Sequence, residues 1–101
     1  MNKIQRSVFV EGREWHDKSG GNSYFSYRLW VDGQIVHTEG MSYGYENAYE
    51  HDAVMWLLGS DYLPDTFTGT QIWHIRRDLG IDAYSTIKSV KKRELFKEEA
   101  N

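Results

Sequence analysis

The sequence predicts one α+β domain over residues 1–101, in which an antiparallel sheet of three meander strands plus a C-terminal strand carries two helices packed on one face. Three features of the sequence lead to this fold. Stretches rich in β-branched and aromatic residues fill the first part of the chain, an Asp-Gly dipeptide joins two of them, and two apolar stripes with helical spacing follow. A chain of 101 residues can bury one hydrophobic core but little more.

The first three strands are expected to form a meander. The stretch Ser7–Trp15 leads into His16–Asn22, a cluster of turn-forming residues. The stretch Tyr24–Val31 then reaches Asp32-Gly33, which favours a type I′ turn because both central residues of that turn adopt positive φ. The stretch Gln34–Thr38 returns antiparallel as the third strand.

A two-residue turn also sets the register of the hairpin. We expect Val31 to face Gln34 and, further from the turn, Arg28 to face His37. Because neighbouring side chains of a strand point to opposite faces, the hairpin residues divide into two sets. The set expected on the core face is Phe25, Tyr27, Leu29, Val31 and Val36. The set expected on the other face is Tyr24, Ser26, Arg28, Trp30, Ile35 and His37.

Apolar residues with helical spacing mark two segments after the meander. The first helix is expected over residues 45–58, with Gly59 as its left-handed cap. The second is expected after Thr68, which forms a capping-box pattern with Gln71. Gly80 then ends the second helix.

The stretch Ile81–Lys92 fits two kinds of structure. Tyr84–Ile87 is rich in residues that favour a strand, whereas Ile87, Val90 and Leu95 would also suit one side of a helix. We assign this stretch to a strand that joins the sheet.

Composition and charge exclude several classes of protein. A net charge of −3 suits neither a basic nucleic-acid coat nor an extreme acidic mimic of nucleic acid. The absence of cysteine excludes disulfides, thiol catalysis and thiolate metal sites, and it suits a reducing compartment. The sequence shows neither a signal peptide nor a stretch long enough to span a membrane, so we expect a cytoplasmic protein with no membrane partner.

No motif in the sequence is typical of an enzyme. His51 adjoins Asp52 but has no second histidine at the helical spacing of a zinc protease, and the other histidines lie in separate segments. We therefore expect surface or hydrogen-bonded histidines. None of the serines sits in a G-x-S-x-G elbow. The expectation is a protein with no catalytic residue, metal or cofactor.

The order of the segments resembles a group of small proteins of tailed bacteriophages and prophages, whose function is not known. The residues that carry the resemblance are Trp15, Gly21–Ser26, Val31–Gly33, Tyr43–Glu46, Tyr49, Ala53, Trp56-Leu57, Trp73–Ile81 and Val90–Leu95. The resemblance covers most of the chain, and its motifs are turn and packing signatures rather than chemistry. It implies a phage protein in the cytoplasm of an infected bacterial host, and it brings no activity or catalytic residue. Phage proteins of this size often inhibit host machinery, defence systems included, as anti-CRISPR proteins do.

Our first hypothesis is therefore a non-enzymatic protein that binds a host protein assembly and inhibits or redirects it. The expected contact residues are the aromatic and basic side chains Tyr24, Arg28, Trp30 and His37, together with the acids Glu46, Glu50 and Asp52 of the first helix. Tyrosine, tryptophan and arginine are enriched at protein interfaces, and acids can steer a basic partner surface into contact. A fully exposed polar helix face would explain the acids equally well.

Two alternatives stay open on the sequence alone. The basic residues Lys88, Lys91, Lys92 and Arg93 could bind phosphates beside the aromatic sheet face, which would make the chain a nucleic-acid-binding accessory protein. Lysines on an exposed strand edge also serve to prevent aggregation, which is the simpler explanation of this cluster. The same exposed rings could instead close a homodimer, which would make the chain a structural or assembly protein.

Overall fold

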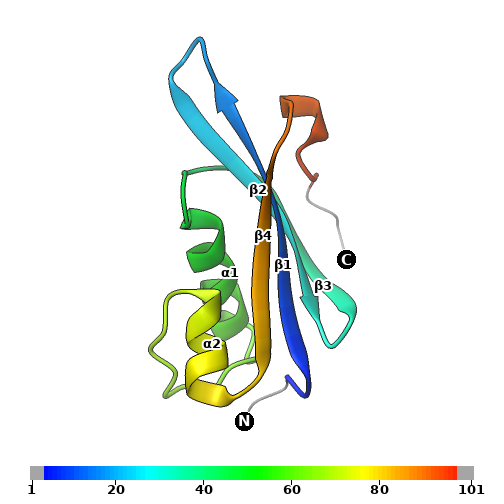
Figure 1. Ribbon diagram of the computed structural model, residues 1–101, viewed down its shortest axis with the longest axis vertical. Helices are drawn as coiled ribbons and strands as arrows, with labels where there is room; N and C mark the ends of the chain where they lie inside the picture. The colour runs from blue at the N-terminus through cyan, green and yellow to red at the C-terminus, as the bar shows by residue number, and fades with distance from the viewer. Residues whose placement is uncertain (1–3, 98–101) are drawn as a thin grey trace.

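The computed structural model describes residues 4–97 and contains four strands and two helices (Figure 1). In chain order they are β1 (Ser7–Asp17), β2 (Asn22–Val31), β3 (Gln34–Tyr43), α1 (Ala48–Gly59), α2 (Ile72–Leu79) and β4 (Asp82–Ser89). A short 3₁₀ turn, Lys92–Glu94, follows β4. The predicted α+β class is confirmed, and so are the meander of three strands, the C-terminal strand and the two helices.

The sheet has the strand order β3-β2-β1-β4. Strand β2 runs antiparallel to β1 and β3, whereas β4 pairs with β1 in the parallel direction. The sheet is therefore mixed, where the sequence predicted antiparallel strands throughout. The reason lies in the connection: α1 brings the chain back along the sheet after β3, so β4 starts at the same end as β1 (Figure 1).

The predicted type I′ turn between β2 and β3 is confirmed. Asp32 and Gly33 have φ values of 52° and 84°, as that turn requires. The Asp32 carboxylate also accepts hydrogen bonds from the backbone N–H groups of Gln5 at 3.0 Å, Arg6 at 2.6 Å and Ser7 at 3.1 Å. These hydrogen bonds lower the pKa of Asp32, and the bond from Gln5 has the largest effect. The turn thus holds the segment that precedes β1.

The register of the hairpin departs from the prediction after two residue pairs. Trp30 faces Ile35 as expected, but a bulge then places Leu29 opposite His37 and Arg28 opposite Thr38. One extra residue in β3 reverses the facing of the side chains that follow it. The prediction that His37 faces Arg28 on the exposed side is therefore wrong.

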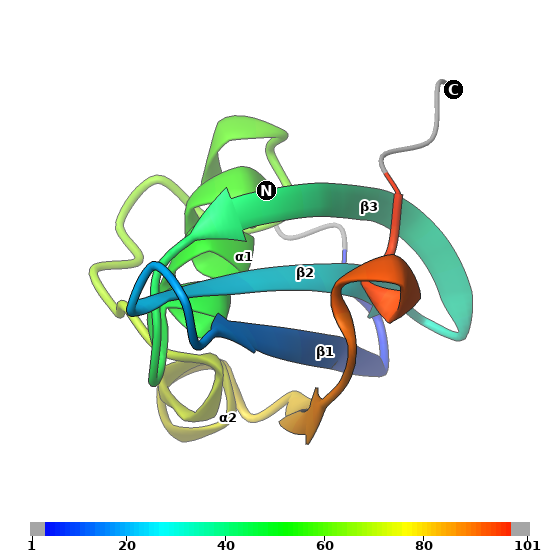
Figure 2. The same ribbon diagram turned by 90° about the horizontal axis from the view of Figure 1, so that it is seen from above.

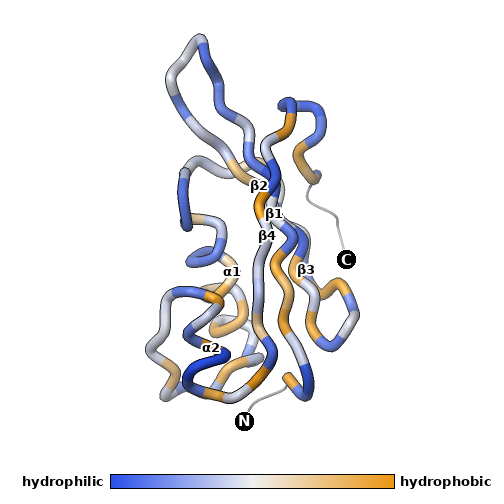
Figure 3. Tube along the Cα trace, viewed as in Figure 1, coloured by the Kyte–Doolittle hydropathy of each residue, from blue (hydrophilic) through white to orange (hydrophobic). Residues whose placement is uncertain are grey.

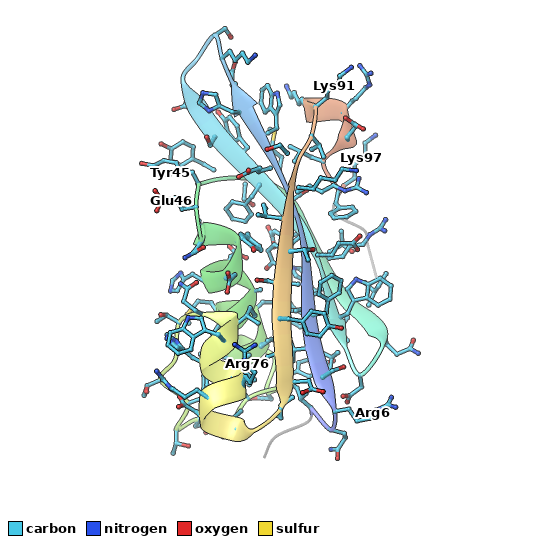
Figure 4. The ribbon with its side chains drawn as sticks, viewed as in Figure 1. Arg6, Tyr45, Glu46, Arg76, Lys91 and Lys97 are labelled. Carbon is cyan, nitrogen blue, oxygen red and sulfur yellow. The ribbon has the colours of Figure 1, made fainter. Side chains whose placement is uncertain are left out.

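The first helix begins later than predicted, at Ala48 instead of Tyr45. Gly44 and Glu46 both have positive φ, at 151° and 58°, so the chain just before Ala48 is not helical. The segment that carries Tyr45 and Glu46 is a loop on the helix side of the molecule (Figure 4).

The end of α1 also differs from the prediction. Gly59 is the last helical residue, and the left-handed position falls on Asp61, whose φ is 63°. The N–H of Asp61 bonds to the carbonyl of Leu58, and the N–H of Tyr62 bonds to the carbonyl of Leu57. This pair of bonds is a Schellman motif, in which an aspartate takes the place that glycine usually fills.

The second helix and its end are as predicted, because Gly80 closes α2 with φ of 66°. Its start uses different residues. The N-cap is Gln71 and not Thr68, and the ring atom Nδ1 of His74 accepts hydrogen bonds from the backbone N–H groups of Thr70 at 2.9 Å and Gln71 at 3.1 Å. His74 thus stabilises the first turn of α2.

The core lies between the helices and one face of the sheet, the inner face. The buried residues that form it across the strands and helices include Val8, Val10, Tyr27, Leu29, Ala53, Leu57, Ile72 and Ile75. The hydroxyl group of Tyr27 donates a 2.6 Å hydrogen bond to the Asp52 carboxylate of α1. Burial, followed by this bond, strongly raises the pKa of Tyr27. Figure 3 shows hydrophobic stretches on the strands as well as on the helices, whereas the tip of the β1–β2 hairpin carries none.

Candidate binding surface on the outward face

The face of the sheet opposite the helices, the outward face, carries side chains in rows that cross neighbouring strands. Figure 2 shows the helices on one side of the sheet and the end of the chain on the other. The apolar row consists of Ile35, Trp30, Phe9 and Tyr84. The next two rows are Thr38, Arg28, Glu11 and Thr86, and then Ser26, Arg13 and Lys88. The aromatic row at the far end is Tyr43, Tyr24 and Trp15.

The apolar row is open to solvent along much of its length. Tyr84 is 52% exposed and Ile35 is 44% exposed. The rings of Phe9 and Tyr84 stack with their centroids 4.9 Å apart, and the partly buried Trp30 donates from Nε1 to Oε1 of Glu11 at 3.3 Å. Trp30 therefore lies on the face that no helix covers, as predicted, and a contiguous apolar strip crosses the whole sheet.

The aromatic row lies at the opposite end of the outward face. Trp15 stacks on Tyr24 with centroids 5.5 Å apart, and Tyr24 meets Tyr43 edge-on at 5.9 Å. Tyr43 is 64% exposed, and the ammonium group of Lys92 lies 5.6 Å from the Trp15 ring. This end of the face is therefore both aromatic and basic.

The end of the chain crosses the outward face between these two rows. We call residues Val90–Lys97 the C-terminal segment. Its first backbone N–H, at Val90, bonds to the carbonyl of Glu14 at 2.8 Å, and the N–H of Phe96 bonds to Oγ of Ser26 at 2.8 Å. Ser26 is fully buried although it points away from the helices, because this segment covers it.

The ring of Phe96 lies against two guanidinium groups. The Cζ atom of Arg13 is 4.0 Å from the ring centroid, and that of Arg28 is 4.4 Å from it. Arg13 also donates from Nη1 to the backbone carbonyl of Glu94 at 2.6 Å. Within residues 4–97 neither guanidinium forms an ion pair with a carboxylate, and Nε of Arg28 is buried without a hydrogen-bond partner.

Basic side chains predominate in the middle and at the aromatic end of the outward face. They are Arg13, Arg28 and Lys88 on the strands, and Lys91, Lys92, Arg93 and Lys97 on the C-terminal segment. The described acids near these side chains include Glu11, Glu39 and Glu94 and, beside Lys91, Glu14 and Asp17. Glu39 bonds to His37, and Glu94 accepts the N–H of Lys91. Figure 4 shows Lys91 and Lys97 on the C-terminal segment and Glu46 on the helix side. The basic residues predicted from the sequence, Lys88, Lys91, Lys92 and Arg93, are thus part of a larger group that also includes Arg13, Arg28 and Lys97.

The three acids predicted as contact residues lie away from this surface, and two of them are used inside the fold. Oε1 of Glu50 accepts the backbone N–H of Ile72 at 3.1 Å and so holds the start of α2. Asp52 accepts the hydrogen bond from Tyr27, as described above. Glu46 alone is exposed. The structure therefore explains Glu50 and Asp52 without any partner.

His37 also belongs to the interior side of the sheet. Its ring stacks on Trp56 of α1 with centroids 4.6 Å apart, and its Nε2 atom lies 2.9 Å from Oε1 of Glu39. Of the four predicted aromatic and basic contact residues, Tyr24, Arg28 and Trp30 share the outward face and His37 does not.

Sequence reasoning missed residues of the outward face that lie outside the hairpin. Phe9 and Arg13 could have been found, because strict alternation in β1 places them on the side opposite Val8 and Val10. The position of Phe96 could not have been found. It depends on a contact between the end of the chain and β2, which no local pattern encodes.

Within the described part of the chain, no group of three or more histidine, aspartate or glutamate side chains is arranged to hold a metal ion. None of the helices at residues 48–59 and 72–79 is long and apolar enough to cross a membrane.

Comparison of the chain with protein-family models, with curated proteins and with solved structures gave no significant match.

Proposed function

We propose that this chain is a non-enzymatic, phage-encoded protein that binds a protein assembly of its bacterial host through the outward face and inhibits or redirects it. The observation that carries this proposal is the apolar row, a strip of large side chains that crosses all four strands and is left open by the fold. The phage source and the host setting come from the sequence resemblance.

The composition of the apolar row supports a protein partner. Tyrosine and tryptophan carry much of the binding energy at protein interfaces, since they bury a large area and lose few rotatable bonds. Trp30 is already fixed by its bond to Glu11, and Tyr84 by its stack on Phe9. Rigid rings that are held before binding lower the entropic penalty of association.

The charge of the outward face indicates which kind of surface would match it. Arg28 and Glu11 lie in the row beside the apolar row, and Arg13 and Lys88 follow toward the aromatic end. The acids Glu50 and Asp52 are engaged within the fold. An acidic partner surface with an apolar centre complements this arrangement, and opposite charges raise the rate of encounter. The sequence had suggested that acids of the first helix could meet a basic partner surface, and the engagement of Glu50 and Asp52 within the fold supports the acidic partner proposed here instead.

The experiment is affinity capture from a lysate of a bacterial host, followed by binding measurements with the purified partner. The double variant Tyr84→Ser with Ile35→Ser removes the two most exposed side chains of the apolar row. Trp73→Ser is the matched control, because Trp73 is 48% exposed but lies on α2. We expect the control to bind like the wild type and the double variant to bind about 10- to 100-fold more weakly. Equal binding by all three proteins would contradict the proposal.

A second candidate function is the binding of single-stranded nucleic acid. Arg13, Arg28 and Lys88 lie between two groups of aromatic rings on one face, and bases stack on such rings while cations contact phosphates. A titration with oligothymidylate at increasing salt separates the candidates. Binding that weakens steeply with salt, and that requires Lys88 and Lys92, supports this second function.

A further inference from the structure

We propose that the C-terminal segment is a releasable strap, and that an acidic segment of the partner protein displaces it and binds Arg13 and Arg28. This inference rests on the proposed function, because it names the chemistry that the partner must carry and the step that regulates access to the outward face.

The C-terminal segment buries its apolar side chains away from the core. Leu95 is 7% exposed and Phe96 is 5% exposed, so both side chains are covered. Neither belongs to the core cluster that joins the sheet to the helices. Their burial is confined to the outward face, so the segment can leave without opening the core.

Few hydrogen bonds hold the C-terminal segment on the sheet. Strand pairing with β1 ends at Ser89, and the segment beyond it adds no strand to the sheet. Its bonds to the strands are the backbone bond of Val90, the bond from Phe96 to Ser26 and the bond from Arg13 to Glu94. An open cavity of about 410 Å³ separates it from part of β3 and is lined by Met41, Leu95 and neighbouring residues. Few bonds and incomplete packing indicate a low free energy of local opening.

The side chains under the strap include two arginines. The Phe96 ring rests on two guanidinium groups that have no carboxylate partner within residues 4–97. A phenyl ring attracts a guanidinium group through its π face but accepts no conventional hydrogen bond from it, and Nε of Arg28 has no hydrogen-bond partner. A carboxylate forms charge-assisted bonds with the same groups and can bind an arginine in bidentate fashion. The surface that Arg13 and Arg28 form under the strap is therefore a better site for carboxylates than for a phenyl ring.

Release of the strap would also change the extent of the outward face. In the closed state the segment lies between the apolar row and the aromatic row, and it covers Ser26. With the segment displaced, both rows and the arginines between them form one surface that spans the length of the strands. The closed state restricts a partner to one end of that surface, and a partner with an acidic segment gains access to the rest.

Hydrogen exchange on the full chain tests the release itself. We compare the wild type with Phe96→Ala and with the control Trp73→Ala. We expect backbone amides of residues 91–96 to exchange faster than those of β1 in the wild type, and Phe96→Ala to accelerate them further by about tenfold because two cation–π contacts are lost. Exchange in this segment as slow as in β1 would overturn the proposal, even if the apolar row binds a partner.

Binding of a fluorescein-labelled polyglutamate peptide tests the site. We expect Phe96→Ala to bind this peptide about tenfold more tightly than the wild type, since a larger share of molecules is open. Adding Arg13→Gln and Arg28→Gln to that variant should abolish the gain. A gain that survives the loss of both arginines, or an oligothymidylate of equal charge that binds more tightly than the peptide, would overturn the assignment of an acidic protein segment.

Discussion

The two faces of the sheet are built by the same strands but are completed in different ways. On the inner face, Leu29 is fully buried and the hydroxyl group of Tyr27 is satisfied by Asp52 of α1. On the outward face, Tyr84 and Ile35 remain exposed, and the guanidinium groups of Arg13 and Arg28 lie against the Phe96 ring and form no ion pair with a carboxylate of residues 4–97. Most large apolar side chains of the inner face are therefore covered by the helices, whereas the outward face leaves Tyr84 and Ile35 exposed.

This difference separates residues that maintain the fold from residues available for binding. Substitutions on the inner face should lower the free energy of unfolding, and substitutions on the outward face should leave it nearly unchanged. The following experiments test that separation in order of decreasing effect on stability.

The largest effect is expected for Leu29→Ala. Leu29 is 0% exposed within the core, so the substitution leaves a cavity and should lower the free energy of unfolding by about 2–5 kcal/mol. Chemical denaturation measures the change. Thr86→Ala, at an exposed position of β4, is the control and should change stability by less than about 0.5 kcal/mol. Similar losses in both variants would mean that the two faces do not differ as described.

A smaller loss, about 1–2 kcal/mol at neutral pH, is expected for Tyr27→Phe, because Asp52 loses its hydrogen-bond donor. The pH dependence is a second signature. The pKa of Tyr27 is raised in the fold, so its contribution is complete below the unfolded tyrosine value of about 10 and is lost as the pH rises above it.

Denaturation between pH 8 and 11 measures this slope. Tyr27→Phe should reduce the alkaline loss of stability but not remove it, since burial also raises the pKa of Tyr49. An alkaline slope identical to that of the wild type would show that Tyr27 does not titrate differently in the folded and unfolded states.

Glu50→Ala tests whether an acid of α1 serves the fold or a partner. The carboxylate accepts the N–H of Ile72 at the start of α2, so its loss should destabilise the chain by about 0.5–2 kcal/mol. Glu50→Gln keeps an acceptor and should recover part of that loss. Affinity for the captured partner should be the same for all three proteins. A large loss of affinity with unchanged stability would indicate that Glu50 contacts the partner and does not stabilise the fold.

The smallest effect on stability, within about 0.5 kcal/mol, is expected for Ile35→Ser on the outward face. Ile35 is 44% exposed and sits on the edge strand β3, opposite Trp30. Isothermal titration with the captured partner should nevertheless show weaker binding. Together with Leu29→Ala, this variant compares opposite faces of one hairpin, and a strong destabilisation here would show that the apolar row supports the fold.

Features of this structure that involve only neighbouring residues could be predicted from local sequence patterns. Asp32-Gly33 correctly predicted the turn of the hairpin, and Gly80 correctly predicted the end of α2. Both features require a positive φ, which depends on the identity of only one or two residues. Alternation in the second strand correctly assigned Tyr24 and Trp30 to the outward face and Tyr27 to the core. Local backbone preference and side-chain alternation were sufficient for these features.

Features that depend on contacts between distant segments could not be predicted in this way. The bulge turned His37 inward, where it stacks on Trp56, and the helical connection made β4 parallel to β1. Glu50 bonds to Ile72, and Phe96 bonds to Ser26, although each pair is far apart in the sequence. Such contacts are selected by the packing of the whole chain, since bonding with a distant partner leaves no periodicity in the sequence around either residue.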